Sequence, residues 1–393
     1  MSERSSVPLD APASAFSSSP SPAAPAAAPA LPAASPGAGS SAGPSRLRRA
    51  APLLVLLVAV LLPWSTLSLP GLFDGPLNSP GTLQLLALCL VFGGLALGYD
   101  LLFGRAGLLS FGHALYIAAG AYGVDILVSH YGWELWTAAA ATVLAAALLA
   151  ALLGSVALQT SGIAFSMVTL AFAQVGHIVI NRDPGGLTGG EEGLPLASAG
   201  LPAAFVGVAN TVNLYWLALA FLTVVVLVVH TIDRAPLGRT LTGLRDDERR
   251  IAVLGLSPYR LKLLAFVLAG ALAALGGVTY AVVVGGASPH VASSELTLSL
   301  IVMAVLGGAG TRWGAVLGGI LYAYLDQRLA RLGGSLPGPL GEPLFVLGTL
   351  FILAVYFVPG GLAGLGGRLE PVRRALGLRR ESGGEPDPAV RTR

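Results

Sequence analysis

The feature that most limits what this chain can fold into is a series of apolar runs that are almost free of charge. Most of these runs approach the roughly 20 residues that a helix needs to cross about 30 Å of hydrocarbon. Only 11% of the 393 residues are charged and 54% are hydrophobic, whereas soluble proteins carry about a quarter charged residues. The pattern therefore predicts an all-α polytopic membrane protein.

We expect about ten membrane helices, with eight to ten compatible with the pattern, and some of them broken or re-entrant because glycines interrupt the runs. The expected spans are residues 50–65, 82–103, 106–128, 133–158, 162–180, 211–232, 262–285, 297–311, 313–331 and 342–359.

The distribution of positive charge predicts how the chain crosses the membrane. If the N-terminus and the C-terminus are both cytoplasmic, all of the 23 lysines and arginines except Arg182, Arg328 and Arg331 lie inside. Cytoplasmic loops of membrane proteins are enriched in these two residues. This orientation also places the loop 181–210 outside.

The chain divides into three parts by composition. Residues 1–45 are rich in Ala, Pro and Ser and have too little bulk to form a core, so we expect a disordered cytoplasmic tail. Residues 46–366 form the predicted transmembrane domain, and residues 367–393 form a basic cytoplasmic tail.

A polar segment, residues 233–262, separates two of the apolar runs and is predicted to be cytoplasmic. Within it we expect a short helix capped by Asp246, with Asp247 and Glu248 near its positive N-terminal end. Gly255 favours a left-handed stop. Such a helix suits docking into another protein, and an ordinary solvated loop whose arginines set the topology is the alternative.

The apolar residues of this segment predict which side of the helix is covered. Leu244, Ile251 and Leu254 fall on one helical face, and the arginines lie elsewhere.

Sequence motifs for enzymatic chemistry are absent. Lys262 is the only lysine and follows a leucine, so the chain has no phosphate-binding loop, and His-Glu-x-x-His is missing as well. The five histidines have no ligand spacing, and Cys89 is the single cysteine. We expect no enzymatic activity, no metal, no cofactor and no nucleic-acid partner.

Polar side chains inside the apolar runs are candidates for a translocation path, because ionisable groups are costly in lipid and normally face protein or water. The loop glycines could equally form a simple turn, and His113 could be bonded to a neighbouring backbone. The candidate residues are Ser110, His113, Tyr116, Thr169, Gln174, Thr188, Gly189 and Gly190.

Five blocks of sequence, in order along the chain, together resemble one known protein family. They are GRAGLLSFGHA at 104–114, GIAFSMVTLAFAQ at 162–174, LTGG at 187–190, GRTLTGLRDDE through GLSPYRLKLLAF at 238–266, and VLGGAGTRWGAVLG at 305–318. The family is that of the permease subunits of branched-chain amino acid ABC importers, of the LivM type.

The resemblance implies an import permease of the cell inner or plasma membrane, surrounded by membrane lipids. Its implied partners are a second homologous permease, two ABC ATPase subunits that bind and hydrolyse ATP, and an extracytoplasmic solute-binding protein. The short helix of the polar segment would then be the coupling helix. The implied coupling residues are Gly243, Arg245, Asp246, Asp247, Glu248, Ile251, Leu254 and Gly255. The Glu-Ala-Ala-x-x-x-Gly pattern of many importer permeases is not literal here, because Arg249 and Arg250 follow Glu248.

Two alternatives remain open at this point. The chain could act alone as an ion-coupled secondary transporter that uses Asp100, Asp125 or His113. It could also belong to the same importer class and carry urea, short amides or other amino acids.

Overall fold

The computed structural model describes residues 57–65, 73, 75–207, 210–332, 343–357 and 360–364. The predicted tails at 1–45 and 367–393 lie outside these residues, as does the first part of the predicted span 50–65.

Long helices dominate the described part of the chain. They are α2 (Pro80–Asp100), α3 (His113–Ser129), α4 (Leu135–Ala157), α5 (Ile163–Arg182), α6 (Thr211–Arg234), α7 (Pro236–Asp246), α8 (Glu248–Val253), α9 (Pro258–Val284), α10 (Ser294–Gly307), α11 (Arg312–Leu332) and α12 (Pro343–Phe357). Several begin at proline, whose fixed φ and missing N–H suit the first helical position.

The all-α membrane fold predicted from the apolar runs is confirmed. Five helices in the described residues are long and apolar enough to cross a membrane: Pro80–Arg105, α4, α5, α6 and α9. The helices α3 and α10 are shorter but also apolar. The total of about ten spans and the side on which each terminus lies stay predictions.

One predicted boundary is wrong. The span expected at 106–128 begins at His113, because the chain leaves α2 through a π-helical turn at Leu101–Arg105 and is not helical from 107 to 112. Gly107 adopts a φ of 71°, in the left-handed region, which ends the helical path there. The prediction of a broken helix in this stretch is confirmed.

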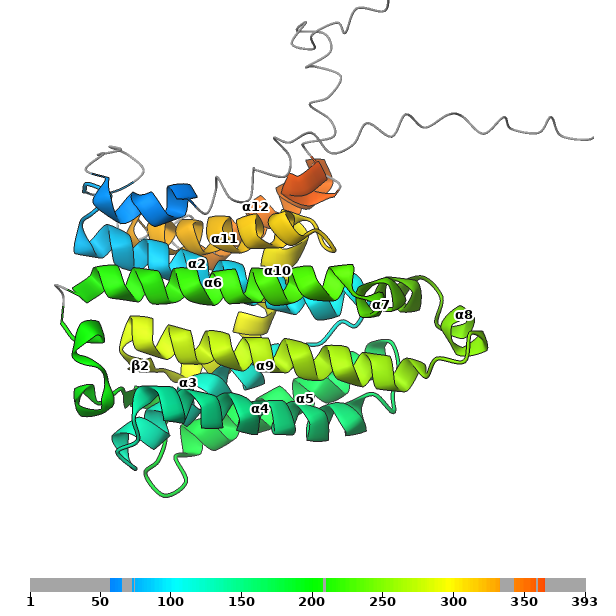
Figure 1. Cartoon of the computed structure of the whole chain (residues 1–393), viewed down its shortest axis with the longest axis horizontal. Helices are drawn as coiled ribbons and strands as arrows, with labels where there is room; N and C mark the ends of the chain where they lie inside the picture. The colour runs from blue at the N-terminus through cyan, green and yellow to red at the C-terminus, as the bar shows by residue number, and fades with distance from the viewer. Residues whose placement is uncertain are drawn as a thin grey trace, which may run out of the picture. The chain divides into compact units, whose positions relative to one another are not determined.

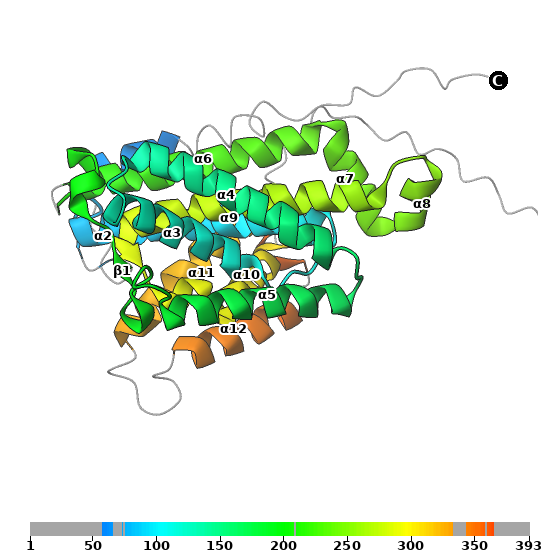
Figure 2. The same ribbon diagram turned by 90° about the horizontal axis from the view of Figure 1, so that it is seen from below.

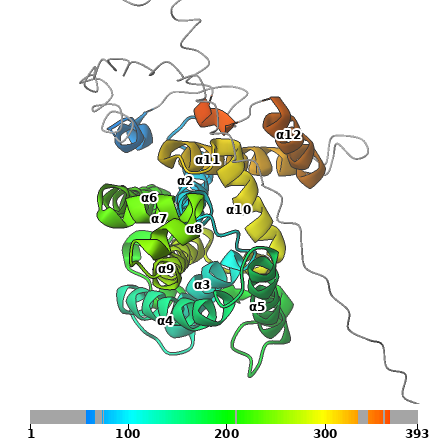
Figure 3. The ribbon, with the colours of Figure 1, turned by 90° about the vertical axis from the view of Figure 1, so that its right-hand side faces the viewer.

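Two helices lie at the centre of the bundle. The share of the most apolar 18-residue stretch of each helix that is buried inside the protein is 78% for α2 with its π-helical turn and 67% for α9. The corresponding share is 22% for α4 and 28% for α5. In the end-on view of Figure 3, α11 and α12 lie on one side and α3, α4 and α5 on the other, with α2, α6, α9 and α10 between them. The outward face of α4 carries Leu144, Leu148 and Leu152 at helical spacing, as expected for contact with lipid.

Glycines allow the central helices to approach closely. A Cβ atom on Gly120 of α3 would collide with the backbone of Ala274 of α9, and one on Gly277 of α9 would collide with the carbonyl of Ile117. Small residues at such contacts let helix backbones pack tightly in lipid, where no hydrophobic effect drives association. The high glycine content therefore serves packing at these positions.

The two ends of the bundle differ. At one end, β1 (Leu194–Pro195) pairs antiparallel with β2 (Gly286–Ala287), which joins the loop after α5 to the end of α9. At the other end, α7 and α8 extend beyond the ends of the neighbouring helices (Figures 1 and 2). The polar segment 233–262, which contains α7 and α8, lies at this second end.

Candidate functional site

The polar segment folds as a helical hairpin between two spanning helices. α6 ends at Arg234, α7 and α8 follow almost without interruption, and α9 begins at Pro258. In Figure 1, α8 is the part of the hairpin farthest from the bundle. The structure thus presents a short helix where a partner protein could reach it.

Asp247 caps α8, so the expectation that Asp246 would do so is wrong. The Asp247 carboxylate accepts hydrogen bonds from the backbone N–H groups of Arg249 at 2.9 Å and Arg250 at 3.2 Å. Asp246 is instead the last residue of α7. Two adjacent aspartates are equally good caps by residue type, and the extended backbone of Asp247, with φ −157° and ψ 104°, decides between them.

Leu244 and Ile251 are buried, and they hold α8 against the rest of the hairpin. Gly243 permits this contact, because a Cβ there would lie 3.1 Å from Cδ1 of Ile251. The prediction that Leu254 lies on the same face as these two residues is wrong. Leu254 follows the last residue of α8 and is 70% exposed.

Val253, which sequence reasoning missed, is 87% exposed beside Leu254. The signal that could have found it is the adjacent pair of large apolar residues just before the helix stop at Gly255, where φ is 81°. Together Val253 and Leu254 are the most exposed large apolar residues of the hairpin, and we call this pair the α8 tip.

Two charged residues of the hairpin bind to the bundle. Glu248 forms an ion pair of 2.6 Å with Lys262 of α9. Arg245 of α7 donates to the backbone carbonyl of Gly104 in the π-helical turn. These contacts fix the hairpin to α9 and to the end of α2.

Three of the predicted path residues meet where α3 begins. The Thr169 hydroxyl of α5 accepts from the backbone N–H of Phe111 at 3.2 Å, and the Ser110 hydroxyl accepts from the N–H of Gly112 at 3.3 Å. Both side chains are buried. His113, the first residue of α3, follows immediately.

The His113 ring packs against two tyrosine rings. Its ring contacts Tyr99 edge-on at a centroid distance of 5.1 Å and Tyr116 at 6.1 Å. The side chain is 1% exposed, and neither ring nitrogen has a hydrogen-bond partner among the described residues. Buried polar groups normally have partners, so this histidine is unusual, and the alternative of a bond to neighbouring backbone is not observed.

The remaining predicted path residues lie elsewhere. Gln174 is exposed on α5, where its amide donates to the Ser294 hydroxyl at 3.2 Å. Thr188 and Gly189 bind Asp183 in the loop after α5: the Asp183 carboxylate accepts from the Thr188 N–H at 2.6 Å and from the Gly189 N–H at 3.2 Å. Gly190 follows with φ 57°. In this structure the loop glycines form a turn, and their part in a path stays a prediction.

The loop turn depends on the charge of Asp183, which lies just beyond α5. Its hydrogen bonds from Thr188 and Gly189 favour the charged carboxylate and hold the pKa of Asp183 below its ordinary value.

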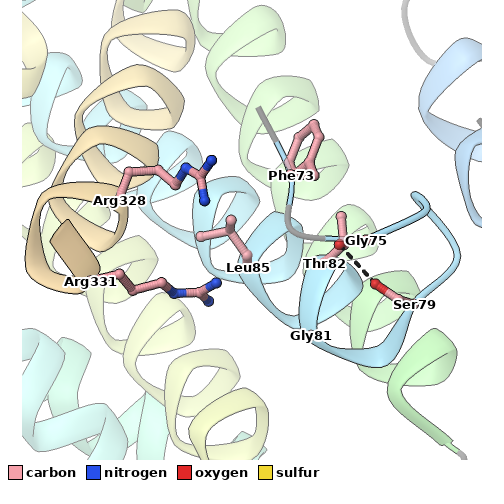
Figure 4. A pocket seen from close by; sticks show the side chains of 8 residues that line it. All are labelled: Phe73, Gly75, Ser79, Gly81, Thr82, Leu85, Arg328 and Arg331. Atoms are coloured by element: carbon pink, nitrogen blue, oxygen red, sulfur yellow. Dashed lines mark hydrogen bonds between the residues drawn. The ribbon is translucent and has the colours of Figure 1, made fainter. Parts of the chain in front are cut away.

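A small cavity of about 200 Å³ opens at the end of α2 away from the hairpin (Figure 4). Arg328 and Arg331 of α11 reach toward it from one side, and Ser79 donates to Thr82 at 2.8 Å on the other. None of the predicted path residues lines this cavity. Among the described residues, no group of three or more His, Cys, Asp or Glu side chains could hold a metal ion.

The chain is similar in sequence to permeases of known transport systems. Residues 81–355 match the family described as "Branched-chain amino acid transport system / permease component". The high-affinity branched-chain amino acid transport system permease protein LivM of Escherichia coli is 29% identical over 306 residues, which cover 72% of this chain and 70% of LivM. LivH of Salmonella typhimurium, a permease protein of the same kind of system, is 23% identical over 265 residues, 59% of this chain and 79% of LivH.

A shorter part of the chain is similar to a permease that is named for a different solute. The autoinducer 2 import system permease protein LsrC of Klebsiella pneumoniae is 36% identical over 152 residues, which cover 36% of this chain and 42% of LsrC.

Proposed function

Because the chain belongs to the permease family of branched-chain amino acid transport systems, we propose that it is one of two related membrane subunits of an ABC importer. As a member of this family it is a multi-pass transport protein of the inner membrane and not an enzyme. ATP would be bound and hydrolysed by two separate ATPase subunits, and an extracytoplasmic binding protein would deliver the solute.

The observation that carries the proposal is the exposed α8 tip. Val253 and Leu254 are 87% and 70% exposed at the end of the hairpin, where contact with lipid does not explain them because charged residues surround them on α7, α8 and the start of α9. Exposed apolar groups with a polar rim mark protein interaction sites. We assign the α8 tip to a groove on an ATPase subunit.

The hairpin supports a coupling role by its connections. It continues directly into α6 and α9, and α9 is central to the bundle. A displacement of α8 by a moving ATPase would therefore reach the packed core through covalent links and not through a flexible linker. Of the predicted coupling residues, Gly243, Asp246, Asp247, Glu248, Ile251, Leu254 and Gly255 stay in the proposed docking set, and Val253 is added. Arg245 is left out of this set because its side chain binds the Gly104 carbonyl.

For the path itself we propose the region around the start of α3. Ser110, His113 and Thr169 converge there, with Tyr116 against the His113 ring. Unwound backbone beside a helix start is a common setting for solute sites in transporters. Gln174, Thr188, Gly189 and Gly190 are assigned to the outer entrance.

The proposed cargo is a branched-chain amino acid. The partial similarity to an autoinducer 2 import permease makes that molecule the second candidate within the same class. Uptake assays of the complete importer with labelled leucine, isoleucine, valine and autoinducer 2 decide between them.

The test of the coupling assignment uses the chain reconstituted in liposomes with two ATPase subunits, a second permease and a solute-binding protein. Leu254→Glu places a charge in the proposed groove and should lower uptake at least tenfold, while insertion and thermal unfolding of the isolated chain stay unchanged. Thr242→Glu is the matched control, because Thr242 is exposed on the adjacent helix α7. Normal uptake by Leu254→Glu would overturn the assignment.

Liposomes that contain this chain without its partners test the ion-coupled alternative. The purified chain alone, given a proton or sodium gradient and no nucleotide, should move no solute. Asp100, one of the residues that this alternative needs, is already paired with Arg105 at 2.8 Å.

A further inference from the structure

Four charged side chains meet at the end of the bundle that bears the hairpin, and we call them the inner charge cluster: Asp100, Arg105, Asp233 and Arg312. Arg105 binds Asp100 through Nη1 at 2.8 Å. It also binds Asp233 through two nitrogens, Nε at 2.8 Å and Nη2 at 3.3 Å. Arg312 then reaches the second oxygen of Asp233 at 3.2 Å. The signs alternate, so the cluster is neutral as a whole.

Each member of the cluster comes from a different structural boundary. Asp100 ends α2, Arg105 ends the π-helical turn, Asp233 lies in the last turn of α6, and Arg312 begins α11. The cluster therefore joins three helices: α2 where it leads into its π-helical turn, α6 where it leads into the hairpin, and α11 just after the turn that follows α10.

The hairpin is attached to this cluster by one side chain. Arg245 of α7 donates to the carbonyl of Gly104, one of the carbonyls that a helix end leaves without an intrahelical partner. Gly104 itself lies against Asp100 and Gly310: a Cβ atom there would collide with the Asp100 carboxylate and the Gly310 nitrogen. Arg245 is thus one residue removed from the buried carboxylate.

Burial makes this arrangement specific. Asp100 is 0% exposed and Arg105 is 6% exposed, and a buried ion pair gains little net stability because desolvation opposes its attraction. Such a pair instead favours a single geometry, because moving either partner away would leave a buried charge unpaired. The cluster therefore fixes the positions of α2, α6 and α11 relative to one another.

We infer that Arg245 and the inner charge cluster transmit movement of the hairpin to the inner ends of α2 and of the α10–α11 turn. This inference rests on the proposed function, in which ATPase subunits move the hairpin. Arg245, Arg105 and Asp100 are then positioning residues: they contact neither the ATPase nor the solute, and they set which helices follow when α8 moves.

The experiment measures solute uptake and ATP hydrolysis in the same liposomes, both per assembled complex. Arg245→Met removes the donor and keeps most of the side-chain volume. We expect assembly to persist, ATP hydrolysis stimulated by the binding protein to stay within about twofold of wild type, and uptake per ATP to fall at least tenfold. Arg245→Lys should restore a part of the uptake, since an ammonium group can still donate to the Gly104 carbonyl.

Arg239→Met is the matched control, because Arg239 is exposed on the same helix and has no bond to the cluster. It should leave uptake per ATP unchanged. A second pair of variants acts from the other side of the contact. Gly104→Ala should lower uptake per ATP as Arg245→Met does, whereas Gly98→Ala should not, because a Cβ at Gly98 would make only an ordinary contact of 3.5 Å with Leu272.

Three results would overturn the inference: unchanged uptake per ATP in both Arg245→Met and Gly104→Ala, failure of Arg245→Met to bind the ATPases, or an equal loss in Arg239→Met. Failure of the proposed function looks different, because the wild-type complex would then show no ATP-dependent uptake at all.

Discussion

The Asp100 carboxylate accepts a hydrogen bond of 2.7 Å from the backbone N–H of Gly310, a residue 210 positions later in the chain. The other oxygen of Asp100 binds Arg105. One buried carboxylate therefore holds the end of α2 to both its own π-helical turn and the turn that begins α11. Replacing it tests how far the bundle depends on that contact.

Asp100→Asn should lower the free energy of unfolding by about 3 kcal/mol, because removing one partner of a buried ion pair leaves the other charge uncompensated. The Asn side chain can still accept from Gly310, so the loss reports the charge. Thermal or denaturant unfolding in detergent micelles measures it. Asp246→Asn, at an exposed position, should change stability by less than about 0.5 kcal/mol, and equal effects of the two variants would contradict the prediction.

Asp247→Ala should loosen α8, because the Asp247 carboxylate satisfies two N–H groups at the start of that helix. Loss of an N-cap costs about 1 kcal/mol of helix stability. Hydrogen exchange at the amides of Arg249 and Arg250 should become several-fold faster. Asp246→Ala is the control, since Asp246 caps nothing, and faster exchange in that variant but not in Asp247→Ala would reverse the assignment of the cap.

His113→Phe separates a packing role from a role in transport. The His113 ring makes aromatic contacts and no hydrogen bond among the described residues, so a phenyl ring of similar shape should keep the unfolding free energy within about 1 kcal/mol. If the start of α3 borders the path, the same variant should still reduce uptake several-fold. Unchanged uptake would remove His113 from the path.

Asp183→Asn tests the pH dependence of the loop after α5. Because hydrogen bonding lowers the pKa of Asp183 in the folded loop, its stabilisation is complete above the ordinary aspartate pKa of about 3.9. The stabilisation is lost as the pH falls through the lowered value. Hydrogen-exchange protection at Thr188 and Gly189 should therefore be constant from pH 7 to about 5 and fall below about 4.

In Asp183→Asn, protection should be weaker throughout and should no longer change with pH over this range. Asparagine suits the control because it tolerates the left-handed backbone that Asp183 adopts, with φ 46°. The same acid-induced loss in the Asn variant would show that another group is responsible.

Much of the fold follows from the apolar runs alone. The predicted spans 133–158 and 211–232 agree within two residues with α4 and α6, because charge and turn residues end an apolar run sharply. The sequence predicts that the helix breaks between α2 and α3, but it does not predict where. Gly104, Gly107 and Gly112 each permit an end of the helix.

The candidate site was less accessible to sequence reasoning. The hairpin and its left-handed stop at Gly255 follow from local residue types. By contrast, the choice of Asp247 over Asp246 as the cap depends on one backbone conformation. The link from Arg245 to Gly104 spans 141 residues, and no periodicity or spacing in a single sequence reveals such a contact.

The glycine contacts between α3 and α9 have a mechanical consequence. Where Gly120 and Gly277 bring the two backbones together, no side chain remains between them that could deform and absorb a small shift. The 27 residues of α9 span about 40 Å at 1.5 Å per residue. A tilt applied at the end of α9 that bears the hairpin is therefore expected to reach the opposite end undiminished, with α3 moving together with α9 as one stiff unit.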